Sequence, residues 1–251
     1  MNRMILSLAV AIGLMGAIHA AAADEISAEQ RQAFEAIIRD YLIKHPEVIK
    51  EAMEELERRQ ALEAQAATKQ KIRERAEEIY HSSGDLVLGN PKGKVTVVEF
   101  FDYNCAYCKR AIPEVEKLIQ TDKDVKVVIK EFPILGPGSV FAAKAALASR
   151  SQGKYNEFHQ ALTKFEGVKD ETSVMQVAEQ VGLDLEKLKT DMESKAVSDV
   201  IGRNYSLAES LSINGTPSFV IDEALEPGYV QYDVLAGHVS AVRQNGGCRV
   251  C

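Results

Sequence analysis

The chain has 251 residues, of which 46% are hydrophobic and 27% charged, and its formal net charge is −7. This length and apolar fraction predict one ordinary domain with a sizeable core and room for an extra module. The acidic balance, without a dense basic cluster, argues against nucleic acid or an anionic membrane as a partner. Four cysteines are too few for a fold held together by disulfides.

The first 23 residues have the pattern of a secretory signal peptide. Arg3 supplies the only positive side chain, residues 4–18 are uncharged and largely apolar, and small residues from Ala20 to Ala23 precede Asp24. No later stretch approaches the roughly 18 apolar residues of a membrane span. We therefore expect a soluble mature protein, exported most simply to a bacterial periplasm.

Residues 24–60 are predicted to form two amphipathic helices. Ser27 and Gln30 have the spacing of a capping box, and Pro46 suits the first turn of a second helix, where no N–H is needed. The apolar stripes have helical spacing and comprise Phe34, Ile37, Ile38, Tyr41 and Leu42 in the first helix and Ile49, Ala52, Met53 and Leu56 in the second.

Residues 61–80 are predicted to be a polar helical linker. Between positions 58 and 75 only Leu62 and Ile72 are large and apolar, so burial cannot hold this helix and we expect a spacer or a hinge. The stripes before it then need another partner. Self-association through residues 26–57 is the simplest way to bury them, and packing on the chain's own domain is the alternative.

The chemistry is expected where a buried strand turns into a helix. Residues 95–101 are a β-branched, nearly continuous apolar run, and helical spacing begins after Cys105. At the helix N-terminus, unpaired N–H groups and the helix dipole favour a Cys105 thiolate, while Cys108 would lie one turn further, on the inner side. We assign Cys105 as the nucleophile and Cys108 as the resolving thiol. Half of a zinc site is the alternative, but it would need a second ligand pair nearby.

Glu99 lies in the same predicted strand, on a face shared with Val95, Val97 and Phe101. A carboxylate among such neighbours is costly when charged, so its pKa should be raised. Lys130, on the next strand, is an alternative structural partner for Glu99.

The second marked stretch is Gly215-Thr216-Pro217-Ser218, directly before a short strand at 219–221. Proline at the start of a strand belongs at an edge or a bend, because it cannot donate to the ladder. A cis bond there would leave the Thr216 backbone free to pair with an extended substrate peptide. An ordinary trans turn proline is the alternative.

Glu-Phe-Phe-Asp-Tyr-Asn-Cys-Ala-Tyr-Cys-Lys at 99–109 and Gly-Thr-Pro-Ser-Phe-Val-Ile at 215–221 together resemble the DsbA-like thioredoxin superfamily. The resemblance implies an α/β thioredoxin fold over about residues 81–246, with an inserted helical domain. It also implies a cis bond at Pro217 and proton transfer between Glu99 and Cys108. We assign substrate contacts to Thr216, Pro217, Ala106 and Tyr107. Ala106-Tyr107 stands where the strongest oxidants of the family carry Pro-His, so a milder oxidant is expected.

A helical stalk before such a domain is similar to the suppressor-of-copper-sensitivity C (ScsC) proteins. That similarity implies a trimer, whereas the residue pattern alone also allows a dimer.

The helical insertion is expected at about 139–211, because strands are predicted on both sides of it, at 125–132 and 219–221. Its segments are 139–151, 154–165, 172–181, 184–194 and 197–211. Gly182 and Asp184 are predicted caps, and His159 is expected to be a surface or packing residue rather than a ligand. A short segment near Leu225 should complete a hairpin, and Asp233 could cap the last helix.

Residues 247–251 carry a second Cys-x-x-Cys pair, Cys248 and Cys251, on a tail expected to be flexible after two glycines. We favour a closed local disulfide of little effect. An auxiliary dithiol that exchanges with Cys105–Cys108 and a Cu(I) site are the alternatives.

These features predict a periplasmic protein thiol–disulfide oxidoreductase that needs no cofactor and acts on cysteines of exported proteins. Oligomeric assembly favours a disulfide isomerase or reductase whose dithiol is kept reduced by a membrane thiol reductase. The alternatives are a dithiol oxidase that introduces disulfides, a copper-sequestering thiol protein, and a holdase.

Overall fold

The computed structural model describes residues 27–251, so the predicted signal peptide lies outside the described residues. The chain divides into two compact units, one ending at Arg59 and the other comprising Gln60–Cys251. We call them the N-terminal unit and the C-terminal unit and describe each by itself. Within residues 27–251, no helix is both long enough and apolar enough to cross a bilayer.

The N-terminal unit contains α1 (Ala28–Lys44) and the first part of α2 (Glu47–Glu74). The predicted capping box is confirmed, because Ser27 Oγ accepts the Gln30 N–H and Gln30 Oε1 accepts the Ser27 N–H. Helix α2 begins at Glu47, one residue after the predicted start at Pro46.

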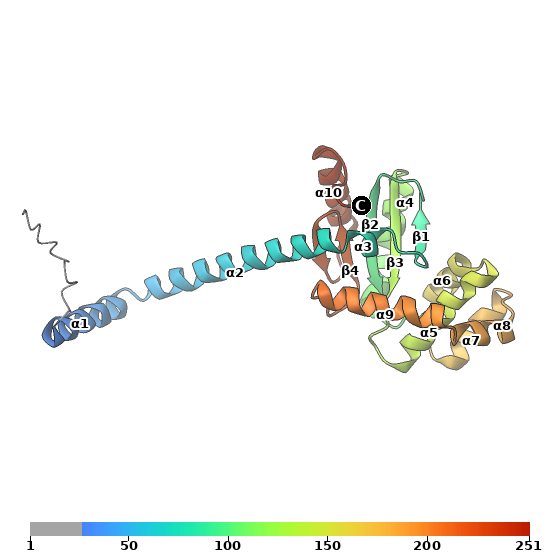
Figure 1. The fold of residues 1–251 in the computed structure, drawn as a ribbon, viewed down its shortest axis with the longest axis horizontal. Coiled ribbons are helices and arrows are strands. Elements are labelled where there is room, and N and C mark those ends of the chain that lie inside the picture. The colour runs from blue at the N-terminus through green and yellow to red at the C-terminus, as the bar shows by residue number, and fades with distance from the viewer. Residues whose placement is uncertain (1–26) are drawn as a thin grey trace, which may run out of the picture. The chain divides into compact units, whose positions relative to one another are not determined.

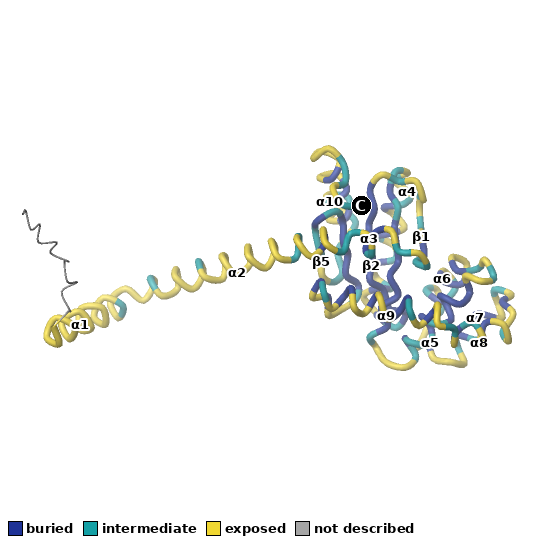
Figure 2. Tube along the Cα trace, viewed as in Figure 1, coloured by how far each residue is buried: buried dark blue, intermediate teal, exposed yellow. Residues whose placement is uncertain are grey.

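The predicted apolar stripes of α1 and α2 are largely uncovered (Figure 2). The exposed large side chains are Phe34, Ile37, Ile38, Tyr41, Ile43, Ile49, Met53, Leu56 and Leu62, and Ile37 is 64% exposed. Both stripes are therefore exposed enough to bind another protein surface.

The predicted linker does not stay polar to its end. Ile72 is fully buried, α2 ends at Glu74, and the short helix α3 (Ala76–Tyr80) carries buried Ile79 and Tyr80. The buried side chains of Ile72, Ile79 and Tyr80 show that residues 61–80 are not a spacer throughout. In fact the last turn of α2 and α3 belong to the core of the C-terminal unit.

A five-stranded sheet lies at the centre of the C-terminal unit (Figure 1), in the order β1-β3-β2-β4-β5. The strands are β1 (Leu86–Gly89), β2 (Val95–Phe101), β3 (Val125–Glu131), β4 (Ser218–Ile221) and β5 (Ala224–Pro227). Strands β2 and β3 run parallel, and the other neighbouring pairs are antiparallel. Strand β1 was not predicted from the sequence; it has only four residues and ends at Gly89 with a φ of 74°.

Helices cover both faces of the sheet. Helices α4 (Ala106–Thr121) and α10 (Tyr232–Gln244) pack on the face that carries Val97 and Phe101, whereas α3 and the end of α9 (Lys195–Ser210) cover the face with Val98 and Phe100. All seven residues of β2 are therefore buried. The N-cap position of α10 is Gln231, so the predicted cap at Asp233 is wrong; Asp233 lies in the first turn.

The helical insertion lies between β3 and β4, as predicted. It contains α5 (Pro137–Ser149), a 3-10 turn (Arg150–Gln152), α6 (Tyr155–Lys164), α7 (Glu171–Gln180), α8 (Leu185–Met192) and α9. Asp184 caps α8 by accepting the Lys187 N–H, and Gly182 has the positive φ of 71° that favours glycine after a helix.

Candidate active site

Cys105 is the N-cap residue of α4, at the turn that follows β2. Its Sγ accepts the backbone N–H of Cys108 over 3.4 Å, in the way a serine or aspartate oxygen caps a helix. Cys105 retains 5% exposure and Cys108 none. Cys105 is therefore the more accessible of the two, as predicted, although both cysteines are largely buried.

Asp102 fixes the loop between β2 and α4. Its carbonyl accepts the Cys105 N–H, and its Oδ1 accepts the Asn104 N–H at 2.8 Å and the Ser139 hydroxyl at 2.7 Å. Its Oδ2 accepts the N–H groups of Ile134 and Leu135. A buried aspartate that turns the chain in this way was missed, although Asp-x-Asn after a strand is a recognisable turn signal.

The second predicted stretch meets the dithiol. The Thr216–Pro217 peptide bond is cis, and the Thr216 carbonyl lies 3.1 Å from Cys105 Sγ, 111 positions along the chain. The cysteine pair and the Thr216–Pro217 bond are therefore close in space, as predicted, and β4 begins directly after this bond.

The two thiols have opposite electrostatic environments. Hydrogen bonds from the side chains of Cys108 and Thr216, together with the N–H groups of the first turn of α4, lower the pKa of Cys105 to about 5. Burial raises the pKa of Cys108, and the nearby Cys105 and Glu99 raise it further. These shifts favour a thiolate at Cys105 and a protonated thiol at Cys108 near neutral pH.

Glu99 is buried in β2 at 3% exposure, and its Oε1 has no hydrogen-bond partner. Burial, with a smaller contribution from the charge on Cys105, raises its pKa to about 8. A cavity of about 350 Å³ between α4, α6 and the sheet is lined by Glu99, Glu116 and His159. The carboxyl group is therefore neutral at pH 7 and borders a space that can admit water.

Lys130 does not pair with Glu99, so that alternative is wrong. Lys130 lies on the other face of β3, where its Nζ contacts Asp85 Oδ2 at 2.6 Å and the Glu78 carbonyl at 2.5 Å. Neighbouring residues in a strand point to opposite faces, and Glu99 is paired in register with Ile129.

Ala106 and Tyr107 are both exposed beside Cys105. The Arg110 guanidinium lies 5.6 Å from the centre of the Tyr107 ring and 4.7 Å from that of Tyr229. Tyr229 follows Gly228, whose N–H donates to the Pro217 carbonyl. The structure therefore brings exposed Tyr107 and the residues that follow β5 to the same side of the cis-proline segment.

A second buried acid, Glu131, was overlooked. It accepts the hydroxyl groups of Tyr103 at 3.0 Å and Tyr155 at 2.9 Å, and burial raises its pKa to about 8. The Tyr103 hydroxyl also lies 2.8 Å from His159 Nδ1. His159 is buried and hydrogen-bonded, which agrees with the packing role predicted for it.

The tail is not free, contrary to the expectation of flexibility. Cys248 and Cys251 are joined as a disulfide, and both residues are partly buried against the C-terminal unit. Thr216 contacts Cys105 just before β4, whereas Cys248 contacts Asp222 just after β4. The two cysteine pairs therefore lie at opposite ends of one strand, and direct exchange between them does not occur in this arrangement.

Comparison with known families and structures agrees with this geometry. Residues 96–240 match the DSBA-like thioredoxin domain, and residues 30–67 match the Copper resistance protein ScsC N-terminal domain.

Among solved structures, a thioredoxin-like oxidoreductase from Silicibacter pomeroyi is 50% identical, with a TM-score of 0.66, over 67% of this chain and 97% of that one. BcfH from Salmonella enterica Typhimurium is 30% identical, with a TM-score of 0.72, over 84% and 95%. A linker-deletion mutant of Proteus mirabilis ScsC is 26% identical, with a TM-score of 0.66, over 89% and 100%.

Among curated relatives, the Na(+)/H(+) antiporter NhaA 3 of Salinispora tropica is 29% identical over 157 residues, which are 62% of this chain and 24% of that protein. The chain thus spans about a quarter of the length of such relatives. The family match covers the region that contains the cysteine pair and the cis-proline, and these two features identify the domain. The chain belongs to the DsbA-like family of thiol–disulfide oxidoreductases and carries an N-terminal domain of the ScsC type.

Proposed function

We propose that this protein is a periplasmic disulfide isomerase or reductase that rearranges disulfides in exported proteins through Cys105 and Cys108. The observation that carries the proposal is a Cys105 of lowered pKa over a buried Cys108, joined in one chain to helices whose apolar faces are uncovered. The Cys105–Cys108 pair can carry out thiol–disulfide exchange, and the uncovered apolar faces can bind further copies of the chain.

In the first step, the Cys105 thiolate attacks one sulfur of a substrate disulfide. A mixed disulfide forms, and the other substrate cysteine leaves as a thiolate that takes up a proton. In isomerisation, a substrate thiolate then attacks the mixed disulfide, which releases Cys105 unchanged. In reduction, Cys108 attacks Cys105 Sγ, so that the substrate gains two electrons and the Cys105–Cys108 disulfide forms.

The reduction route requires Cys108 to lose its proton. We assign this proton to the ionised form of Glu99, which first releases its own proton to the cavity, because the charge of Glu99 influences Cys108 and because the Glu99 oxygen Oε1 has no partner of its own. A pKa of about 8 lets this carboxyl group take up and release protons near neutral pH. Water in the cavity would carry the proton onward.

We propose that the exposed stripes of α1 and α2 are buried by further copies of this chain, as a trimer. Contiguous apolar stripes of this kind mark an interaction surface. Several Cys105 sites in one assembly could hold a substrate while its bonds are rearranged. A membrane thiol reductase would return the Cys105–Cys108 disulfide to the dithiol.

Refolding of scrambled ribonuclease by the full-length protein tests the proposal. We expect activity in the natural protein and loss of it in Cys105→Ser. Equal ribonuclease refolding by both proteins would contradict a catalytic role for Cys105. The redox state of Cys105 and Cys108 trapped in the periplasm separates the directions, since an isomerase or reductase is held reduced and a dithiol oxidase is held oxidised.

Assembly is tested by light scattering on Ile38→Glu, which places a charge in the α1 stripe. Arg39→Glu is the matched control, because residue 39 lies well away from the stripe on the helix circumference. We expect Ile38→Glu to lower the oligomer mass and the isomerase activity, with simple dithiol oxidation retained. A monomeric natural protein, or unchanged isomerisation by the dissociated variant, would contradict the proposed assembly.

A further inference from the structure

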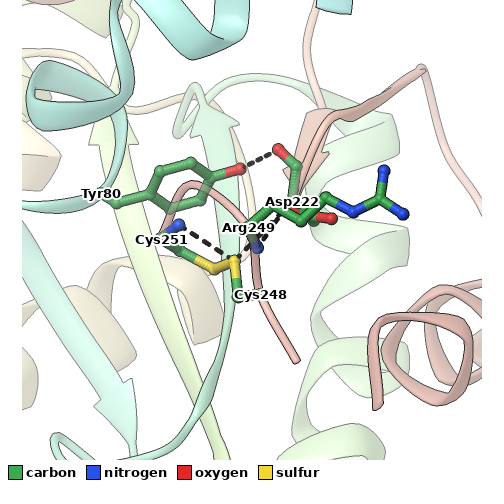
Figure 3. The surroundings of a disulfide bond; sticks show 5 residues. All are labelled: Tyr80, Asp222, Cys248, Arg249 and Cys251. Carbon is green, nitrogen blue, oxygen red and sulfur yellow. Dashed lines mark hydrogen bonds between the residues drawn. A yellow bond between two sulfur atoms is a disulfide. The ribbon is translucent and has the colours of Figure 1, made fainter. Parts of the chain in front are cut away.

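The C-terminal disulfide lies against the turn that joins β4 to β5 (Figure 3). We propose that Cys248–Cys251 is a second, independent site of thiol–disulfide exchange, reduced by an external dithiol. We further propose that its redox state sets how firmly residues 72–80 are held on this turn.

Asp222 is the centre of the contact. Its Oδ1 accepts the backbone N–H of Arg249 at 2.8 Å and lies 3.4 Å from Cys248 Sγ. Its backbone carbonyl accepts the Tyr80 hydroxyl at 2.6 Å (Figure 3). The tail and α3 therefore meet on one residue of the turn.

Glu223, the next residue, joins the same segments by charge. Its carboxylate accepts two hydrogen bonds from Arg73 at the end of α2, at 2.5 and 3.0 Å, and lies 3.5 Å from the Arg249 guanidinium. The Glu223 side chain is 9% exposed, so these contacts are partly shielded from solvent.

Apolar packing adds to the polar contacts. Val250 and Cys251 pack against the cluster that contains Ile72, Ile79 and Tyr80. The tail and residues 72–80 therefore share one hydrophobic cluster as well as the polar contacts of Asp222 and Glu223. A change in the conformation of the tail would therefore weaken the packing of residues 72–80 first.

The disulfide gives the tail its shape. Gly246 and Gly247 both have positive φ, at 91° and 107°, and precede a turn closed by the bond between Cys248 and Cys251. Opening this bond returns conformational freedom to a short, glycine-led tail. Forming the contacts with Asp222 and Glu223 then costs more conformational entropy. These contacts are therefore present for a smaller fraction of the time.

The pair is reachable from outside and not from its own active site. Both cysteines are partly exposed, and strand β4 separates them from Cys105. A thiolate of an external dithiol attacks one sulfur, the S–S bond breaks, and the other cysteine leaves as a thiolate. The second thiol of the reductant then displaces the first cysteine, so the reductant is oxidised to a disulfide and the tail gains two electrons and two protons.

Hydrogen exchange measured by mass spectrometry tests the proposal on the full-length chain. Cys105→Ser/Cys108→Ser serves as the background, so that dithiothreitol changes only the tail. We expect exchange at residues 72–80 to become faster by on the order of tenfold when the tail is reduced. Cys248→Ser/Cys251→Ser in the same background should give the fast rate with or without dithiothreitol. Exchange in α6 should be the same in every sample.

Asp222→Gly is the matched variant for the contact itself, because it removes the Oδ1 acceptor of the Arg249 N–H. Glycine suits the left-handed conformation of this residue, whose φ is 51°, and the cysteines stay intact. We expect partly accelerated exchange at residues 72–80 with the disulfide still closed.

Two results would overturn the proposal. One is the same exchange at residues 72–80 in oxidised, reduced and doubly substituted protein. The other is a tail disulfide that resists dithiothreitol, by maleimide labelling of released thiols, until the whole chain unfolds.

Discussion

Glu99→Gln should change how the stability of this protein depends on pH. Burial holds the pKa of Glu99 at about 8 in the folded chain, against an ordinary value of 4.5. The folded state therefore binds the Glu99 proton across a pH range in which the unfolded chain has lost it. Stability falls as the pH rises through this range, and the favourable contribution is fully lost above about pH 8. Glutamine has nearly the same shape but does not titrate.

The size of the effect follows from these two pKa values. Between about pH 6 and about pH 9, the single-site linkage relation gives a loss of roughly 2–3 kcal/mol in the natural protein. Other titrating groups are common to both proteins and cancel in the difference. The free energy of unfolding of Glu99→Gln, relative to the natural protein, should therefore rise by roughly 2–3 kcal/mol over this range. Its value at low pH reflects only how well the amide packs.

Urea unfolding across this pH range measures the difference, with Cys105–Cys108 oxidised in both proteins so that these thiols do not titrate. Glu116→Gln is the control, since it makes the same chemical change at an exposed residue that lines the same cavity. A constant difference between Glu99→Gln and the natural protein, within about 0.5 kcal/mol, would show that Glu99 is charged in the fold. The proton-relay assignment would then lose its basis.

Three further predictions concern the active site and its support. Iodoacetamide should modify Cys105 with a rate that rises around pH 5, as followed by mass spectrometry, while Cys108 stays unmodified in the folded chain; equal labelling of both would contradict the assignment of roles. Asp85→Asn should destabilise the fold by about 3 kcal/mol in urea unfolding, because it leaves buried Lys130 without its counter-charge, and a loss below about 1 kcal/mol would show that this lysine is neutral. Burial lowers the pKa of His159 to about 4, so the unfolded chain takes up a proton first as the pH falls below about 6.5. The natural protein should therefore lose about 3 kcal/mol between pH 7 and pH 4 that His159→Gln does not lose, and parallel unfolding curves would refute this.

The dithiol could be predicted from the sequence because its signals are local. A buried run ending in Asp102, two cysteines at one-turn spacing and helical periodicity from Cys105 onward are all within one short segment. The contact between Cys105 and the segment at Pro217 joins residues far apart in the sequence. It was predicted only through the resemblance to a family. The Thr216–Cys105 contact then follows from β4 pairing beside β2.

The features that could not be predicted are contacts between segments far apart in the sequence. They depend on which face of the sheet each side chain points to. Lys130 is adjacent to Glu131 in sequence and one strand away from Glu99, but it points to the opposite face, toward Asp85. Strand β1 was missed for the related reason that four residues give no clear alternation. The burial of Ile72 and the docking of Cys248 likewise come from tertiary contacts that leave no periodic signal.

The direction of catalysis does not reside in the dithiol alone. A Cys105 pKa of about 5 lies between the values of about 3.5 for DsbA and about 7 for thioredoxin. Because a less stabilised thiolate makes a weaker oxidant, we expect this dithiol to be a milder oxidant than DsbA. A dithiol of intermediate potential can both accept and donate electrons. Its net reaction is then set by the partner that recharges it and by whether α1 and α2 place several copies around one substrate.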